Sequence, residues 1–385
     1  MNSIIFVSGL SFSTNNRGTQ ALGYGALPFL FKKNILNKND TVISPSVFKN
    51  PLKHLKNRKE EFRLNVENHS VKIIERKYWY YDIVFSELCF KIFKFFPFFT
   101  PYGRAIKKTK YISAICGGDG FSDIYSEHTM KDHSYWLLKA YNYKIPYIFL
   151  PQTIGPFFDL KNYGFAKHLL QNAYQVYVRD VAFNEELNKM NIEVKIENDL
   201  SYFMMPQEVS IKLPENKKIG LNISGLCYYN SFYNLTGKFD NYKKLLLQIV
   251  KTHQNKGVSI ILIPHSYNHT APEKFADDLE ASRDFYNSLE NKDNVVLIED
   301  DLKSPEIKYL ISKMDFFIGS RLHSCFAAIF TKVPVFGLAY SYKYEHNFKK
   351  FNLPNNQYSV IDLKENDIPK ILTLVENSEN YSLNQ

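Results

Sequence analysis

The residues best suited to chemistry lie between Phe316 and Tyr344, in the segment FFIGSRLHSCFAAIFTKVPVFGLAYSYKY. An apolar run ends at Gly319, and Ser320 can cap a following helix whose opening turn contains Arg321 and His323. Backbone amides and the helix dipole favour an anion at such a position. Arginine binds phosphate or carboxylate through paired hydrogen bonds, and histidine exchanges protons near neutral pH. The segment therefore predicts an anion site with a proton donor beside it.

Two further basic side chains follow neighbouring apolar runs. Lys343 comes after Val333–Gly337 and would place a second cation at the same edge of the sheet, where the strands end. His265 stands in IPHS after Val258–Ile263. It is either a residue that lines the site or a structural histidine, and the sequence leaves both interpretations open.

Two glycine-containing segments in the first half also follow apolar runs. In ICGGDGFSDIY the glycines would let the backbone approach a ligand, while Asp119 and Asp123 could hold sugar hydroxyls or accept a proton. A plain tight turn explains the same residues equally well. The segment SFSTNNRGTQAL offers backbone amides to an anion, but a simple turn with Thr19 near a helix start is the better interpretation. The segment ICGGDGFSDIY has neither the Walker A nor the dinucleotide-binding glycine spacing.

A rigid loop is predicted at Leu150–Phe157, LPQTIGPF, after another apolar strand. Its two prolines fix the backbone, so the loop should keep one shape and present Gln152 and Thr153. The next strand ends in YVRD, where Arg179 is either an anion ligand or the partner of a local ion pair.

Short apolar runs alternate with helical patterns along the whole chain, as in parallel sheets covered by helices. We therefore expect an α/β protein of two doubly wound Rossmann-like domains, residues 1–208 and 209–385, the second ending in a helical tail. Prolines and charges at 205–217 interrupt the pattern between them. Ligands of such folds bind beyond the carboxyl ends of strands, here in the interdomain cleft. The expected strands are Ile4–Val7, Thr41–Ile43, Val71–Ile74, Tyr111–Cys116, Tyr147–Leu150, Val176–Val178, Ile219–Ile223, Val258–Ile263, Asn294–Ile298, Phe316–Gly319 and Val333–Gly337.

Composition limits the class of protein. The 385 residues are 45% hydrophobic and 23% charged, which is typical of a globular protein. The net charge of +9 is spread along the chain without a basic tail or zinc-finger spacing, so we expect no nucleic-acid partner. Four dispersed cysteines without CxxC predict neither disulfides nor zinc, and favour a reducing cytoplasm. No signal peptide or membrane span is predicted.

One segment, Tyr78 to Tyr102, is unusually aromatic and contains Lys91 and Lys94 among phenylalanines. It is either a buried helix and loop over the first sheet or a face that contacts the inner side of the plasma membrane. The buried interpretation is favoured, since aromatic stripes usually belong to a core.

Taken together, NRGTQAL, GGDGFSDIY, PQTIGPF, VRD, IPHS and GSRLHS…PV…YSYK resemble, in this order and across almost the whole chain, the bacterial polysaccharide pyruvyl transferase family. PQTIGPF and RLHS with the downstream tyrosine and lysine are the most specific parts. The resemblance implies a GT-B-like fold and transfer of a pyruvyl group from phosphoenolpyruvate onto a sugar as a ketal, with release of phosphate. The acceptor would be a lipid-linked or nucleotide-linked precursor of an exopolysaccharide, capsule or cell-wall glycan, and no cofactor or metal is required.

By position, the family's Arg–Leu–His falls on Arg321, Leu322 and His323, which implies donor binding and, for His323, acid catalysis. Some members have an arginine after the first strand of the second domain, where GLNISG places Ser224. The second cation must then come from elsewhere, with Arg179 and Lys343 as candidates, or the donor differs. Two other classes stay open: a GT-B glycosyltransferase using a nucleotide sugar, and a non-catalytic protein of glycan assembly.

Overall fold

The computed structural model describes residues 3–50, 58–66, 68–341 and 343–380, and the chain divides into two compact units. The first unit contains Met1–Phe12 and Leu22–Phe203, and the second contains Ser13–Ala21 and Met204–Gln385. The change from one unit to the other at Phe203 precedes the expected boundary at 208. The assignment of Ser13–Ala21 to the second unit was not expected from the sequence.

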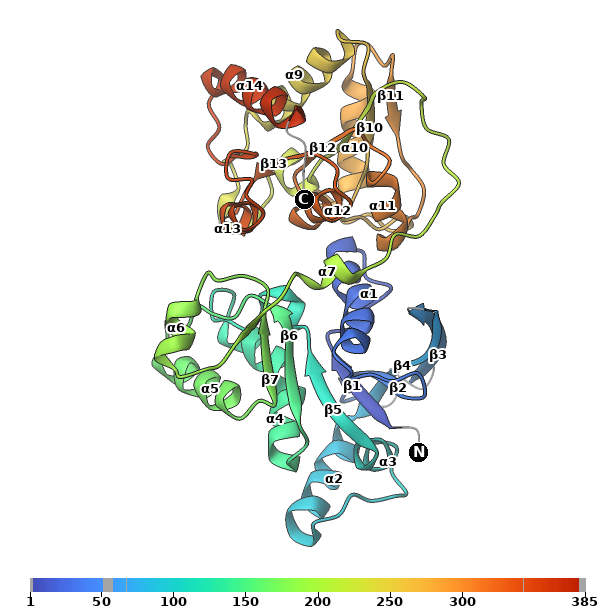
Figure 1. Ribbon diagram of the computed structural model, residues 1–385, viewed down its shortest axis with the longest axis vertical. Helices are drawn as coiled ribbons and strands as arrows, with labels where there is room; N and C mark the ends of the chain where they lie inside the picture. Colours follow the sequence, from blue (N-terminus) through green and yellow to red (C-terminus); the bar gives the residue numbers. More distant parts are fainter. Residues whose placement is uncertain (1–2, 51–57, 67, 342, 381–385) are drawn as a thin grey trace. The chain divides into compact units, whose positions relative to one another are not determined.

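The first unit is built on an eight-stranded sheet with the order β3-β4-β2-β1-β5-β6-β7-β8. Figure 1 labels the strands β1 to β7 of this unit. All of its neighbouring strands are parallel except β3, which pairs antiparallel with β4. The strands are β1 Ile4–Ser8, β2 Thr41–Phe48, β3 Lys59–Val66, β4 His69–Trp79, β5 Thr109–Ala114, β6 Tyr147–Gln152, β7 Gln175–Val178 and β8 Lys195–Ile196.

Helices cover both faces of this sheet. One apolar cluster joins it to α2, α3, α4, α5 and α6, and a second joins the opposite face to α1 and α7. The helical elements are α1 Arg17–Lys32, α2 Tyr80–Phe93, α3 Pro101–Lys107, η2 Cys116–Gly118, α4 Glu127–Tyr143, α5 Leu160–Gln171, α6 Asn184–Lys189 and α7 Leu200–Phe203. Because both faces are covered, central strands such as β6 are buried along their whole length.

The second unit has a six-stranded parallel sheet with the order β11-β10-β9-β12-β13-β14. Helices α9 and α14 pack on one face, and α11, α12 and α13 pack on the other. The elements are β9 Lys218–Asn222, α8 Gly225–Tyr228, η3 Tyr233–Leu235, α9 Tyr242–Gln254, β10 Ser259–Leu262, α10 Asp278–Ser288, β11 Val295–Leu297, α11 Ser304–Ile311, β12 Phe316–Gly319, α12 Leu322–Phe330, β13 Val335–Ala339, α13 Lys343–Lys350, β14 Gln357–Ser359, η4 Glu365–Asp367 and α14 Ile368–Glu379.

The two sheets confirm the predicted α/β class, and every predicted strand is present within a few residues of its expected bounds. The strands β3, β8 and β14 were not predicted. β3 is a charged strand, KEEFRLNV, whose residues are mostly exposed at the edge of the sheet, so it lacks the apolar run that marks the buried strands. β8 and β14 are two and three residues long, too short to leave a periodic pattern.

The aromatic segment after β4 departs from its favoured interpretation. Within α2 the buried residues are Ile83, Ser86 and Cys89, whereas Leu88 and Ile92 are more than half exposed. The prediction of a buried helix is therefore correct for one side of α2 and wrong for the other. The helix packs on α3 and β4 and leaves an apolar side uncovered within its own unit.

Candidate functional site

Arg321 stands at the carboxyl end of β12 and is the N-cap residue of α12. Its backbone N–H donates to Asn222 Oδ1 at 2.8 Å. Asn222 is the last residue of β9, the strand that pairs with β12, and it is opposite Gly319 in the register. The side-chain amide of Asn222, at the end of β9, therefore fixes the start of α12, the helix that follows β12.

The guanidinium of Arg321 is held by Asp278 in the first turn of α10. Nη2 donates to Oδ1 at 2.6 Å, while Nε lies 3.1 and 3.2 Å from the two carboxylate oxygens. The Asp278 side chain is fully buried and also accepts hydrogen bonds from the backbone N–H groups of Gly225 and Ser266, at 2.9 Å each. A buried carboxylate is stable as an anion only with such donors, so this residue organises the loops that follow β9 and β10.

Arg321, the anion ligand that the sequence predicts, is thus paired with a buried carboxylate in this structure. Its remaining terminal nitrogen, Nη1, lies 3.5 Å from the hydroxyl of Tyr340. Tyr340 directly follows β13, the neighbouring strand, so three strand ends contribute to this network. Asp278 was not predicted from the sequence, although the pair Asp277–Asp278 before an amphipathic stretch is a recognisable helix-start signal.

His265 follows β10 and is 3% exposed. Its backbone N–H points to Asp278 Oδ2 at 3.3 Å, and its carbonyl accepts from the N–H of Arg17 at 3.1 Å. Burial lowers the pKa of the His265 imidazole well below its ordinary value, and the charges of His323, Arg321 and Arg17 lower it further. The imidazole is therefore neutral near pH 7.

His323 lies in the first turn of α12, with the edge of its ring toward Phe326. Gly18, near the start of α1, approaches the ring closely: a Cβ on Gly18 would stand 2.7 Å from His323 Nδ1. Only glycine leaves room for the imidazole in this position. Leu322, which begins α12, packs against the apolar cluster beneath the helix.

Arg17 explains why Ser13–Ala21 belongs to the second unit. Its Nε donates to Leu302 O at 2.7 Å, its Nη2 pairs with Asp301 at 2.8 Å, and the guanidinium lies over the Tyr267 ring. The side chain of Gln20 also accepts a hydrogen bond from the backbone N–H of Ser304. Asn16 Oδ1 accepts the N–H groups of Gly18 and Thr19, so the predicted turn into a helix is present. Long-range side-chain contacts in addition hold this turn to the second unit.

Ser224 and Lys343 flank the same strand ends. Ser224 is fully buried and its N–H donates to the Tyr242 hydroxyl, which also bonds Ser320 Oγ at 2.6 Å. Lys343 begins α13, and the next residue, Tyr344, donates its hydroxyl hydrogen to the carbonyl of Ser320. Position 224 therefore lies inside the network around Arg321, and α13 is tied to the residue that precedes Arg321.

Arg179 belongs to the first unit, where it is 3% exposed. Its Nη1 pairs with Asp199 at 2.8 Å and its Nε donates to Thr153 Oγ1 at 3.0 Å. Asp119, which accepts the hydroxyl hydrogen of Tyr125 at 2.7 Å, contributes to the surrounding negative potential. The ion-pair interpretation of Arg179 is the one that the structure matches, with Asp199 as its main partner and the adjacent Asp180 at 3.6 Å.

The LPQTIGPF loop does not present its polar side chains. Gln152 is fully buried with its Nε2 directed at Ala114 O, and the Thr153 hydroxyl donates to Asp180. Asp123 accepts the backbone N–H groups of Phe158 and Asp159 and so fixes the entry to α5. The side chains that the sequence predicts to be presented to a ligand are therefore buried in this structure, where Gln152 Nε2 and the Thr153 hydroxyl bond internal polar atoms.

The structure brings Arg321, His323 and His265 together at one sheet edge, with Arg17, Gly18 and Asp278 as unpredicted members. Within the described parts of the chain, no group of three or more His, Cys, Asp or Glu residues is arranged to hold a metal ion. Likewise, none of the helices in those ranges is long and apolar enough to cross a membrane.

The two parallel sheets with covering helices place the chain among GT-B-type folds. It is similar to UDP-N-acetylglucosamine 2-epimerase structures: a putative one from Listeria monocytogenes (11% identity, 99% of this chain and 90% of that chain, TM-score 0.56) and one from Methanocaldococcus jannaschii (10%, 100% and 93%, 0.56). A third, from Neisseria meningitidis and bound to UDP-GlcNAc, gives 14% identity, 99% and 95% coverage and a TM-score of 0.52. These identities show a shared fold alone.

The sequence identifies the family more narrowly. The chain belongs to the polysaccharide pyruvyl transferase family, whose model matches residues 16–342. That range contains Arg17, His265, Asp278, Arg321 and His323. No curated protein matches the chain in sequence.

Proposed function

We propose that the protein transfers the pyruvyl group of phosphoenolpyruvate onto a sugar of a cell-surface glycan precursor. The observation that carries this proposal is the convergence of Arg321, His265 and His323 at the carboxyl edge of the second sheet, in a chain of this family. Phosphoenolpyruvate carries a carboxylate and a phosphate, and groups of this kind are bound by arginine, lysine and helix N-termini.

In this proposal Arg321 binds the donor carboxylate through its Nη1 side, while Asp278 holds the opposite side of the guanidinium. Because Asp278 balances the charge of Arg321, the phosphate needs other cations. Lys343 and protonated His323 are the candidates in the second unit. Arg179 is left out, since Asp199 and Thr153 already occupy its guanidinium.

His323 is proposed to protonate the methylene carbon of the enol phosphate. This makes the neighbouring carbon electrophilic, and a sugar hydroxyl adds to it and loses its proton. A second hydroxyl of the same sugar then displaces phosphate and closes the ketal. Fixed charges that surround such a centre contribute several kcal/mol, on the order of 3 kcal/mol for one well-placed donor.

Neutral His265 supports this role for His323. A second charged imidazole beside His323 would raise the free energy of the imidazolium form that acts as the acid. The low pKa that burial gives His265 removes this repulsion near neutral pH. Asp278, buried behind Arg321, is a positioning residue in this scheme and does not exchange protons with the substrate.

The test is to incubate the purified chain with phosphoenolpyruvate and a panel of nucleotide-linked and lipid-linked sugars. Inorganic phosphate release and a pyruvyl-modified sugar in the mass spectrum are expected together. Thermal protection by phosphoenolpyruvate is expected from a donor site of this kind. Protection by a nucleotide sugar with hydrolysis of its glycosyl bond would favour a glycosyltransferase. If no phosphoenolpyruvate is consumed with any sugar of the panel, the result would favour a non-catalytic protein.

A further inference from the structure

The outward side of α2 is apolar, which reverses the usual pattern of a surface helix. Its exposed large side chains recur at helical spacing, one to two turns apart, and each is at least 40% exposed within the folded chain. They are Tyr81, Val84, Phe85, Leu88 and Ile92. The described part of the same unit leaves this apolar stripe exposed, so another surface is needed to bury it.

The last residue of α2 and the loop between α2 and α3 extend this apolar side with aromatic rings. Phe93, Phe95, Phe98 and Phe99 are between 51% and 73% exposed. The loop is held in shape, because Arg104 Nη1 donates to the carbonyls of Phe98 and Phe99 at 3.1 Å each. Together the α2 stripe and these four phenylalanines form what we call the aromatic face.

Charges around the aromatic face are sorted by sign. Asp82 accepts the backbone N–H of Tyr102 at 3.0 Å, and Glu87 pairs with Lys139 of α4 at 2.7 Å, so both carboxylates of α2 are used inside the unit. Lys91 and Lys94 are exposed beside the phenylalanines. The charges that the helix directs outward are therefore positive.

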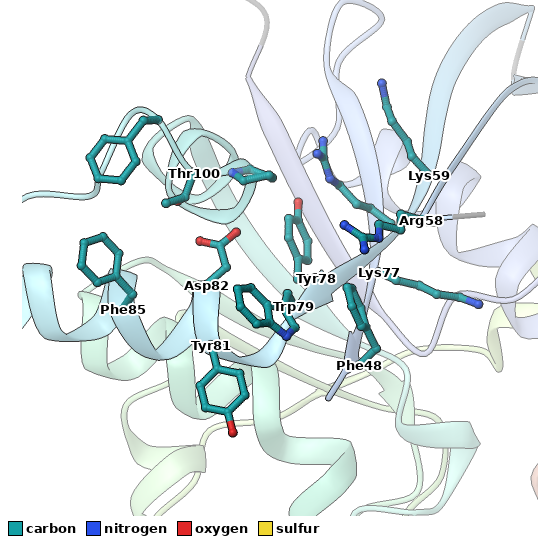
Figure 2. Close-up of a pocket in the computed structure, with 13 residues that line it drawn as sticks. Phe48, Arg58, Lys59, Lys77, Tyr78, Trp79, Tyr81, Asp82, Phe85 and Thr100 are labelled. Atoms are coloured by element: carbon teal, nitrogen blue, oxygen red, sulfur yellow. The ribbon is translucent and has the colours of Figure 1, made fainter. Parts of the chain in front are cut away.

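A cavity of about 400 Å³ opens at the start of α2, between this helix and the strands of the sheet edge. Figure 2 shows Tyr81 and Phe85 on the helix side and Arg58, Lys59 and Lys77 on the strand side. Its lining contains four basic residues, with Arg76 the fourth, against the single carboxylate of Asp82, and one of the four, Lys59, pairs with Glu61. A basic, aromatic-walled hollow beside an exposed apolar helix suits an anionic headgroup at an apolar boundary.

We propose that the aromatic face and this cavity dock the protein on an anionic phospholipid bilayer. The exposed rings of α2 and its loop enter the interfacial layer, while the lysines and the cavity's basic residues contact lipid phosphates. A second copy of the chain fits less well, because two such faces would bring like charges together in a protein of net charge +9. The proposal is independent of pyruvyl transfer.

The test uses the full chain and sedimentation with vesicles of phosphatidylcholine containing about 30 mol % phosphatidylglycerol, with phosphatidylcholine alone for comparison. The wild type is expected to sediment with the anionic vesicles and much less with the neutral ones. Leu88→Glu with Ile92→Glu should lower the partition coefficient by about tenfold or more, because both charges would enter the apolar layer.

The matched control is Leu160→Glu with Ile196→Glu, two exposed aliphatic positions on α5 and β8 of the same unit. It should bind vesicles like the wild type. Lys91→Glu with Lys94→Glu should abolish the preference for anionic vesicles, which tests the proposal even if the Leu88 variant fails to fold. Absence of wild-type sedimentation overturns the proposal, as does an equal loss in the control. A wild-type dimer that Leu88→Glu with Ile92→Glu makes monomeric, without vesicle binding, would assign the face to a second copy.

Discussion

At the scale of single residues, Gly18 lies close against the imidazole of His323 in the candidate site. A side chain at position 18 would stand 2.7 Å from the imidazole, so the glycine sets where the proposed acid lies. The presence of the histidine and the position of its ring are therefore two separate properties. Each can be tested by its own substitution.

We predict that His323→Ala lowers phosphate release from phosphoenolpyruvate by about 10²- to 10⁴-fold, as expected when a general acid is removed. The melting temperature should change little, because His323 is only half-buried. Gly18→Ala keeps the histidine but displaces its ring, so turnover should fall while the helix remains stable. Near wild-type turnover in His323→Ala would show that the acid is another residue.

A second prediction at this scale concerns the ion pair of Arg321 with Asp278. Asp278→Asn leaves a buried guanidinium without its counter-charge and should lower the free energy of unfolding by about 3–5 kcal/mol. Urea denaturation would measure this change. The exposed pair of Lys238 with Asp362 provides the comparison, since Asp362→Asn should cost less than about 1 kcal/mol. Equal effects of the two substitutions would contradict the organising role of Asp278.

At the scale of elements, two helices bury a histidine whose charged form the fold disfavours. Burial lowers the pKa of His253 in α9, which also hydrogen-bonds the carbonyl of Ile249. The same cause lowers the pKa of His133 in α4. In both cases the folded-state value lies below that of the unfolded chain. Protons therefore bind the unfolded chain first as the pH falls.

Stability should consequently decline as the pH is lowered through about 6.5, by at most about 1.4 kcal/mol per pH unit for each such group. Thermal melts between pH 7.5 and 5 would measure how steeply the stability changes with pH. His253→Gln should flatten it, whereas His128→Gln should not, because His128 is exposed on the surface of α4. An unchanged slope in His253→Gln would exclude this helix as a source of the pH dependence.

At the scale of the whole molecule, a segment from the amino-terminal part of the sequence folds as part of the carboxyl-terminal unit. The guanidinium of Arg17 holds the segment in place: it donates to the Leu302 carbonyl, pairs with Asp301 and lies over the ring of Tyr267. The first turn of α1 consequently contributes Arg17 and Gly18 to a site whose other members, His265, Asp278, Arg321 and His323, follow residue 260. The second unit is incomplete without it.

We predict that Arg17→Ala loosens Ser13–Ala21 and lowers turnover, because Gly18 would lose its fixed place beside His323. Hydrogen exchange of the amides of Arg17 and Gln20, both bonded in the native fold, should rise by at least about tenfold. Arg17→Lys keeps the charge but not the forked geometry and should give an intermediate result. Unchanged exchange in Arg17→Ala would show that other contacts hold the segment.

Local sequence determined the alternation of strands and helices, since a strand covered on both faces must be apolar along its length. The motifs around Arg321 and His323 also identified the family that the comparison confirms. The exceptions, such as β3, are edge elements whose stability comes from pairing with a neighbour rather than from their own apolar residues.

Which charges meet depends on long-range contacts that form with the fold. Arg321 is paired with a residue 43 positions earlier, and Arg17 with a carbonyl 285 positions later. These contacts depend on the strand order, which sets β9 between β10 and β12 and so brings their carboxyl ends together. Electrostatic energy depends on distance and burial rather than on residue type, and sequence specifies neither until the sheet has formed.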